Sequence, residues 1–135
     1  MEIGWNSQAS CFVRSTVDVL LRLEGAGSDV ELAAVRATNA LPVYLDMGGA
    51  LCFTPEGRVL HFDWGSETAG PENDPDWILV AAVAAAEKYP ALRHILPARP
   101  AAAETCSRCH GSGRVAMTAN FLARCGKCFG LGWVG

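Results

Sequence analysis

A pattern of two cysteines and two glycines, CxxCxGxG, occurs twice near the end of the chain, at residues 106–113 and 125–132, and constrains the fold more than any other feature. Two cysteines separated by two residues can direct both sulfurs to one side of a tight turn. Four thiolates from two such turns form the tetrahedral shell of structural zinc sites. The fifteen residues between Cys109 and Cys125 suit this arrangement. We therefore predict one structural Zn²⁺, with four ligands: Cys106, Cys109, Cys125 and Cys128.

Glycines at fixed places after each cysteine pair support this interpretation. Gly111 and Gly130 follow the second cysteine of each pair, and Gly113 and Gly132 lie two residues further on. The backbone must turn back past the metal at these places, and glycine adopts positive φ angles without steric cost. We predict that these four glycines form the turns around the site.

The doubled pattern resembles the cysteine-rich zinc region of DnaJ-type co-chaperones, in which such repeats form β-hairpin knuckles that hold zinc in pairs. That region has four repeats and two zinc ions, whereas residues 106–132 contain two repeats and match one ion. The resemblance implies the same four cysteine ligands in a C-terminal zinc-knuckle β-hairpin module. Because the chain has no His-Pro-Asp tripeptide, co-chaperone activity is not implied.

Other uses of the cysteines remain open. Redox-active CxxC pairs need a first cysteine at a helix N-terminus, and disulfide frameworks are typical of secreted domains. Gly126, Gly130 and Gly132 favour turns over a helix around the second pair. His110, beside Cys109, could replace a cysteine as ligand, although four sulfurs already complete the pattern.

Composition indicates a soluble, cytoplasmic protein. Half of the 135 residues are hydrophobic, but no apolar stretch reaches the 18 residues that a membrane span requires. The N-terminal residues lack the basic start and apolar run of a secretory signal. In a reducing compartment the thiols are free to bind metal.

The charge is unevenly distributed along the chain. Residues 1–100 carry seven Lys and Arg against thirteen Asp and Glu, and residues 101–135 carry four against one. Zinc with four thiolates is itself negative, so the basic residues near the site can simply offset it. Nucleic-acid binding requires a surplus of positive charge and often stacking aromatics. Phe129 and Trp133 could stack on bases, but we do not favour this function.

Apolar periodicity predicts three helices. The first spans residues 9–24, and the second spans residues 29–38 after a capping box that begins at Ser28. The third begins after Asp74 and runs to Tyr89, with Trp77, Leu79, Val80 and Val83 expected to face inward.

Short β-prone segments at residues 43–45, 50–54 and 58–63 are separated by turn residues and predict a three-stranded antiparallel meander. Helices packed on one side of it would give an α+β layer. An acidic loop is expected over residues 65–76.

Two prolines in four residues mark a linker that divides the chain. We predict an α+β body over residues 1–96, a Pro/Ala linker over residues 97–105 and a zinc-binding module over residues 106–135.

The segments Gly48–Phe53 and Gly57–Trp64 are similar to the central hairpin of the SUKH superfamily of α+β proteins. Many members are bacterial immunity proteins that neutralise a toxin by binding it. The resemblance implies a protein partner, and an acidic body suits a basic toxin because opposite charges speed association. We expect the binding surface on the acidic loop and the exposed strand face, at His61, Asp63, Glu67, Glu72, Asp74 and Asp76.

Catalysis is not predicted. His61 and Asp63 share one strand face, and with Asp46 or Glu67 they could form an acid/base or second metal site. Polar residues on a solvated sheet face are the commoner arrangement. The chain contains no nucleophile elbow, phosphate loop or His-Glu-x-x-His motif.

The sequence thus predicts a non-enzymatic zinc-binding protein that acts by protein–protein interaction, with toxin neutralisation as a particular case. One alternative is a chaperone-like or thiol–disulfide factor that handles unfolded proteins through its CxxC knuckles. Nucleic-acid binding is the other.

Overall fold

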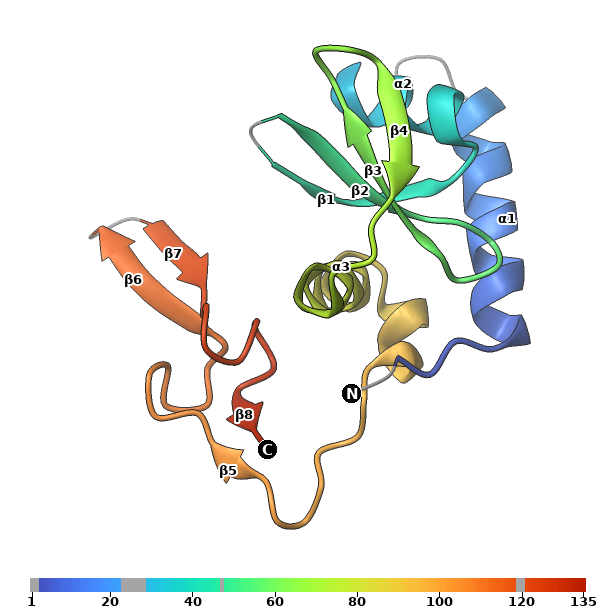
Figure 1. Cartoon of the computed structure of the whole chain (residues 1–135). Helices are drawn as coiled ribbons and strands as arrows, with labels where there is room; N and C mark the ends of the chain where they lie inside the picture. Colours follow the sequence, from blue (N-terminus) through green and yellow to red (C-terminus); the bar gives the residue numbers. More distant parts are fainter. Residues whose placement is uncertain (1–2, 23–28, 47, 119–120) are drawn as a thin grey trace. The chain divides into compact units, whose positions relative to one another are not determined.

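The computed structural model describes residues 3–22, 29–46, 48–118 and 121–135. The chain forms two compact units, Met1–Leu96 and Pro97–Gly135. Figure 1 traces both units along the sequence.

The first unit is built on an antiparallel sheet in the order β1-β2-β3-β4. We predicted three strands, and the structure adds a fourth inside the expected acidic loop. This edge strand has only small or polar side chains, so no apolar alternation marks it in the sequence. Its backbone pairs with β3, with His61 opposite Gly70. The strands are β1 (Leu41–Leu45), β2 (Gly49–Phe53), β3 (Val59–Asp63) and β4 (Thr68–Pro71).

Helices cover both faces of this sheet, which agrees with the predicted α+β class. On one face, Leu51 and Phe53 of β2 share a buried cluster with residues from the first and third helices. On the other, Ala50, Cys52 and Phe62 pack against Ala34 of the second helix. The helices, visible in Figure 1, are α1 (Ser7–Arg22), α2 (Asp29–Thr38), α3 (Pro75–Lys88) and the 3₁₀ helix η1 (Pro90–Ile95).

The helix ends agree in part with the sequence pattern. Asp74 caps α3 by accepting a hydrogen bond from the backbone nitrogen of Asp76, at 2.9 Å, and Pro75 occupies the first turn, where its missing N–H is tolerated. The capping box predicted at Ser28 and the end predicted for the first helix, residues 23–24, lie outside the described residues.

The second unit has two small antiparallel ladders. Strand β6 (Arg114–Thr118) pairs with β7 (Phe121–Arg124), and β5 (Glu104–Thr105) pairs with β8 (Trp133–Val134). Residues 97–103 contain no helix or strand. The last two residues of the predicted linker therefore belong to β5.

None of the helices in the described part of the chain combines the length and the apolar character that a membrane span requires.

We predict that Gly49→Ala destabilises the first unit. A methyl group on Gly49 would overlap the backbone oxygen of Phe62 on the neighbouring strand, whereas one on Gly70 would meet nothing within 4 Å. Overpacking of this kind costs about 1–3 kcal/mol. Urea unfolding of the intact protein should show this loss for Gly49→Ala and almost none for Gly70→Ala. Equal stability of the two variants would contradict the register of β2 and β3.

Candidate metal centre

The four cysteines of the doubled pattern converge in the second unit. Their sulfur atoms all lie within 4.8 Å of one another, and all four residues are buried. The Sγ atoms of Cys106 and Cys125 are 3.8 Å apart, and those of Cys109 and Cys128 are 3.6 Å apart. The predicted ligands thus form one cluster.

The dimensions of the cluster fit a single ion. Zinc binds thiolate sulfur at about 2.3 Å, and a regular tetrahedron of that radius places neighbouring sulfurs about 3.8 Å apart. The Cys106–Cys125 separation of 3.8 Å and the Cys109–Cys128 separation of 3.6 Å are close to this value. Because four sulfurs fill a tetrahedral shell, the donor set is that of a closed structural site with no open position for substrate.

The two CxxCxGxG repeats hold each other by equivalent hydrogen bonds. The backbone nitrogen of Cys106 donates to the oxygen of Gly132 at 2.9 Å, and that of Cys125 donates to the oxygen of Gly113 at 2.9 Å. Within each repeat, the last glycine donates its N–H to the second cysteine sulfur: Gly113 to Cys109 and Gly132 to Cys128, both at 3.2 Å. These amides stabilise negative charge on the sulfurs.

The glycines of the pattern have positive φ, at 85° and 76° for Gly111 and Gly113 and at 96° and 86° for Gly130 and Gly132. The repeats also cross closely. A Cβ on Gly113 would lie 2.5 Å from the Gly130 oxygen, and one on Gly132 would lie 2.5 Å from the Gly111 oxygen. The glycines therefore permit both the turns and the contact between the two turns.

Two further residues adopt left-handed backbone angles that the sequence reasoning missed. His110 has φ 54° and Phe129 has φ 57°, each at the position after the second cysteine. Both residues occupy the same position of their repeat, so an alignment of the two repeats could have pointed to this shared backbone conformation. His110 is exposed, and the metal-binding cluster found among the described residues consists of cysteines alone.

Few apolar residues surround the sulfurs. Val115, Leu131 and Val134 pack against the cluster. On the outside, Lys127 Nζ donates to Ser107 Oγ at 2.9 Å and joins the two CxxC turns. The sulfurs are thus the centre of the unit's small core.

Two of the clustered thiols have pKa values shifted in opposite directions. Burial raises the pKa of Cys109, but hydrogen bonds from Gly113 and from the sulfurs of Cys128 and Cys106 outweigh it and lower that pKa to about 6. Burial and the neighbouring thiols of Cys109 and Cys125 raise the pKa of Cys128 to about 11. A bound divalent cation would remove this conflict, because it compensates several thiolates together.

The two remaining cysteines are separate from this cluster. Cys11 is exposed on α1, and Cys52 is buried in β2. Burial raises the pKa of Cys52 to about 12, against a smaller lowering by the Thr38 side chain. Cys52 therefore stays a neutral thiol at ordinary pH.

Three of the six residues predicted to bind a partner line two separate hollows of the first unit. His61 and Glu72 line a hollow of about 260 Å³ together with Asp46, Leu51 and Trp77. His61 Nε2 lies 3.3 Å from Asp46 Oδ2. We predicted Trp77 to face inward, but 43% of it is exposed. It lies in the first turn of α3, ahead of the stretch that the sheet covers.

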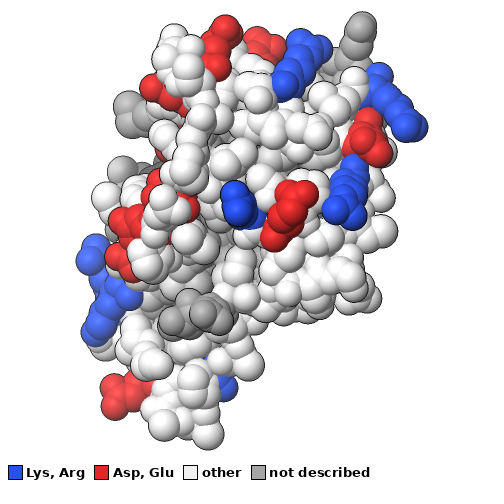
Figure 2. Space-filling view, turned by 45° about the vertical axis from the view of Figure 1, so that its right-hand side comes forward, with Lys and Arg blue, Asp and Glu red and all other residues white. Residues whose placement is uncertain are grey.

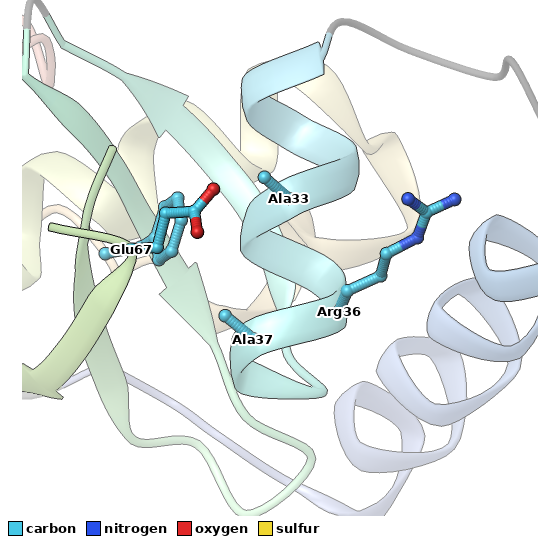
Figure 3. A pocket seen from close by; sticks show the side chains of 5 residues that line it. Ala33, Arg36, Ala37 and Glu67 are labelled. Atoms are coloured by element: carbon cyan, nitrogen blue, oxygen red, sulfur yellow. The ribbon is translucent and has the colours of Figure 1, made fainter. Parts of the chain in front are cut away.

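Glu67 lines a separate, open hollow of about 350 Å³. Figure 3 shows its carboxylate pointing towards α2, while Arg36 points away from the hollow. Glu67 has φ 55°. The remaining lining residues are Ala33, Ala37 and Phe62.

The other predicted carboxylates have local roles. Asp63 accepts a hydrogen bond from the Gly65 nitrogen at 2.9 Å, and Asp74 caps α3. Asp76 is exposed in the first turn of that helix. On the face shown in Figure 2, the Lys and Arg side chains of the described residues are interspersed with Asp and Glu and form no continuous basic patch.

Comparisons with protein-family models, curated proteins and solved structures gave no match to this chain. The four-cysteine cluster is compatible with a zinc-binding motif, and the two family resemblances rest on their motif residues alone.

We predict that Gly113→Ala and Gly132→Ala each weaken zinc binding by about tenfold or more. The contacts between the two repeats hold the cysteine ligands in position, and loss of such supporting contacts lowers metal affinity. The added methyl group would collide with the other repeat's backbone. Gly126→Ala is the matched control, because a Cβ there meets nothing within 4 Å. Competition with a chromogenic chelator measures the affinities. Unchanged affinity in both variants would contradict the crossing of the repeats.

We predict that thiol reactivity at pH 8 separates three kinds of cysteine. Cys11 should react at once with a thiol reagent in the metal-loaded protein, because it is exposed. Cys52 should react only on unfolding, because its raised pKa keeps it protonated. The four clustered cysteines should react after chelation. Mass spectrometry of alkylated peptides identifies each site, and rapid labelling of Cys52 in the folded protein would contradict its burial.

Proposed function

We propose that this chain is a non-enzymatic zinc protein in which one structural Zn²⁺ holds the second unit folded, and that it acts by binding another protein. The observation that carries the zinc assignment is the convergence of four buried cysteine sulfurs within 4.8 Å. All four positions of a tetrahedral ion are filled by protein, so the ion's role is structural.

The second unit needs the metal because its apolar core is small. Besides the cysteines, its buried cluster is supported by three partly buried side chains, those of Val115, Leu131 and Val134. A chain of this length rarely folds on apolar burial alone, and zinc binding supplies folding free energy in such modules. The first unit has two buried apolar clusters of its own.

Removal of zinc should therefore unfold one unit and spare the other. After chelation, amide hydrogen exchange should become fast across β5 to β8 and stay slow across β2 and β3. Elemental analysis should find one zinc per chain before chelation and none after it. Cys106→Ser combined with Cys125→Ser should reproduce the effect without chelator, whereas Cys11→Ser should not. Retained protection in the second unit without metal would refute a structural role.

The protein-binding part of the proposal has separate support. The first hundred residues have an excess of acidic side chains, and the segment that resembles the SUKH hairpin forms the paired strands β2 and β3. An excess of acidic side chains on this unit favours association with a basic protein such as a toxin. In this proposal the protein works in the cytoplasm, where reduced thiols can bind zinc.

Binding can be tested by affinity capture from the source organism followed by reconstitution with the purified partner. We expect a basic protein that binds in a defined ratio and whose toxic activity is suppressed. A chaperone-like factor would instead capture many unfolded proteins, and a nucleic-acid binder would show an affinity that falls steeply with salt. Either result would contradict a basic toxin as the partner.

A further inference from the structure

We propose that the hollow lined by Asp46, Leu51, His61, Glu72 and Trp77, here called the Trp77 groove, binds an arginine side chain of the partner protein. This inference rests on the proposed protein-binding function and names the chemistry that the partner must present. The groove has a volume of about 260 Å³ and lies wholly within the first unit.

The size of the groove favours one side chain over a free small molecule. Sites for drug-sized ligands occupy about 300–1,000 Å³ and enclose most of the ligand, whereas this groove is smaller. One long side chain entering from a partner surface matches such a space. Its lining is mixed, with apolar Leu51 and Trp77 and the carboxylates of Asp46 and Glu72.

The aromatic wall of the groove is available for contact. Trp77 is 43% exposed, and its ring centroid lies 6.4 Å from that of Tyr44 at an interplanar angle of 49°. An indole face attracts cations, and it stacks best with the planar guanidinium of arginine. An exposed tryptophan beside carboxylates therefore favours a cationic guest.

The carboxylates leave acceptor capacity for that guest. Glu72 Oε1 accepts a hydrogen bond from the Asp74 nitrogen at 3.1 Å, and within the described residues no partner is recorded for its Oε2. Asp46 uses Oδ1 for the Gly48 nitrogen and Oδ2 for His61. Glu72 is thus the better acceptor for a guanidinium, whose N–H groups can bind one carboxylate in parallel.

Other roles for the groove are less consistent with its lining. Covalent catalysis would need a side-chain nucleophile beside His61, and the described lining residues include no serine, threonine, cysteine or lysine. The second hollow has the single carboxylate of Glu67, since Arg36 points away from it. Among the described residues, the lining of the Trp77 groove has two acidic side chains and no Lys or Arg.

The test is an NMR titration of the intact, zinc-loaded protein with the capped peptide acetyl-Gly-Arg-Gly-amide. The Trp77 indole N–H signal, assigned with Trp77→Phe, should shift in a saturable manner at millimolar peptide. The same peptide with citrulline in place of arginine has the shape without the charge and should bind about fivefold more weakly or not at all. The lysine peptide should also bind more weakly than arginine, because it cannot stack.

Single-residue variants test whether the arginine peptide binds in the Trp77 groove. Glu72→Gln should weaken the arginine peptide about fivefold and Trp77→Ala should abolish the saturable shift, whereas Asp18→Asn, an exposed carboxylate on α1, should change nothing. Equal binding of the citrulline peptide, or equal loss in Asp18→Asn, would overturn the proposal. So would a self-association of the free protein that Glu72→Gln removes, since a second copy would then be the occupant.

The zinc content of the same sample, together with capture of a partner, reports on the proposed function independently. A normal zinc content and a captured partner without peptide binding would reject the groove alone.

Discussion

The second unit depends on one electrostatic constraint: four cysteine sulfurs share a buried space too small for four separate negative charges. Burial raises both pKa values, but the Gly113 amide and neighbouring sulfurs lower that of Cys109 to about 6, whereas that of Cys128 rises to about 11. A single divalent cation is the simplest group that would stabilise all four thiolates together. The other contacts of the unit follow from this geometry. The glycine turns let the repeats cross, the amides point at the sulfurs, and the short ladders connect the turns.

The two units obtain their stability in different ways. The first buries Leu51 and Phe53 on one face of its sheet and Phe62 on the other, so burial of apolar surface can hold it folded. The second concentrates its burial on the cysteines. The two sources of free energy are separate, so the apolar core of the first unit does not depend on the cysteine cluster.

The sequence predicted the cysteine cluster but missed one strand and the exposure of one aromatic residue, for physical reasons. The cysteine and glycine spacing encodes the site locally, because each turn is complete within eight residues. Strand β4 carries no apolar alternation, since an edge strand is held by backbone pairing alone, and it was missed. The position of Glu72 depends on that strand. Periodicity assigned Trp77 to the core, yet α3 is covered mainly along its alanine-rich later turns.

The distances between sulfurs also bear on the redox alternative. A thiol–disulfide pair works through two cysteines of one CxxC motif, with the first at a helix N-terminus and accessible to substrate. Here sulfurs of different repeats are also in close contact, Cys106 with Cys125 at 3.8 Å and Cys109 with Cys128 at 3.6 Å, and all four residues are buried. A substrate disulfide could reach these sulfurs only if the surrounding turns opened. The arrangement therefore favours a permanent structural ligand set over an electron carrier.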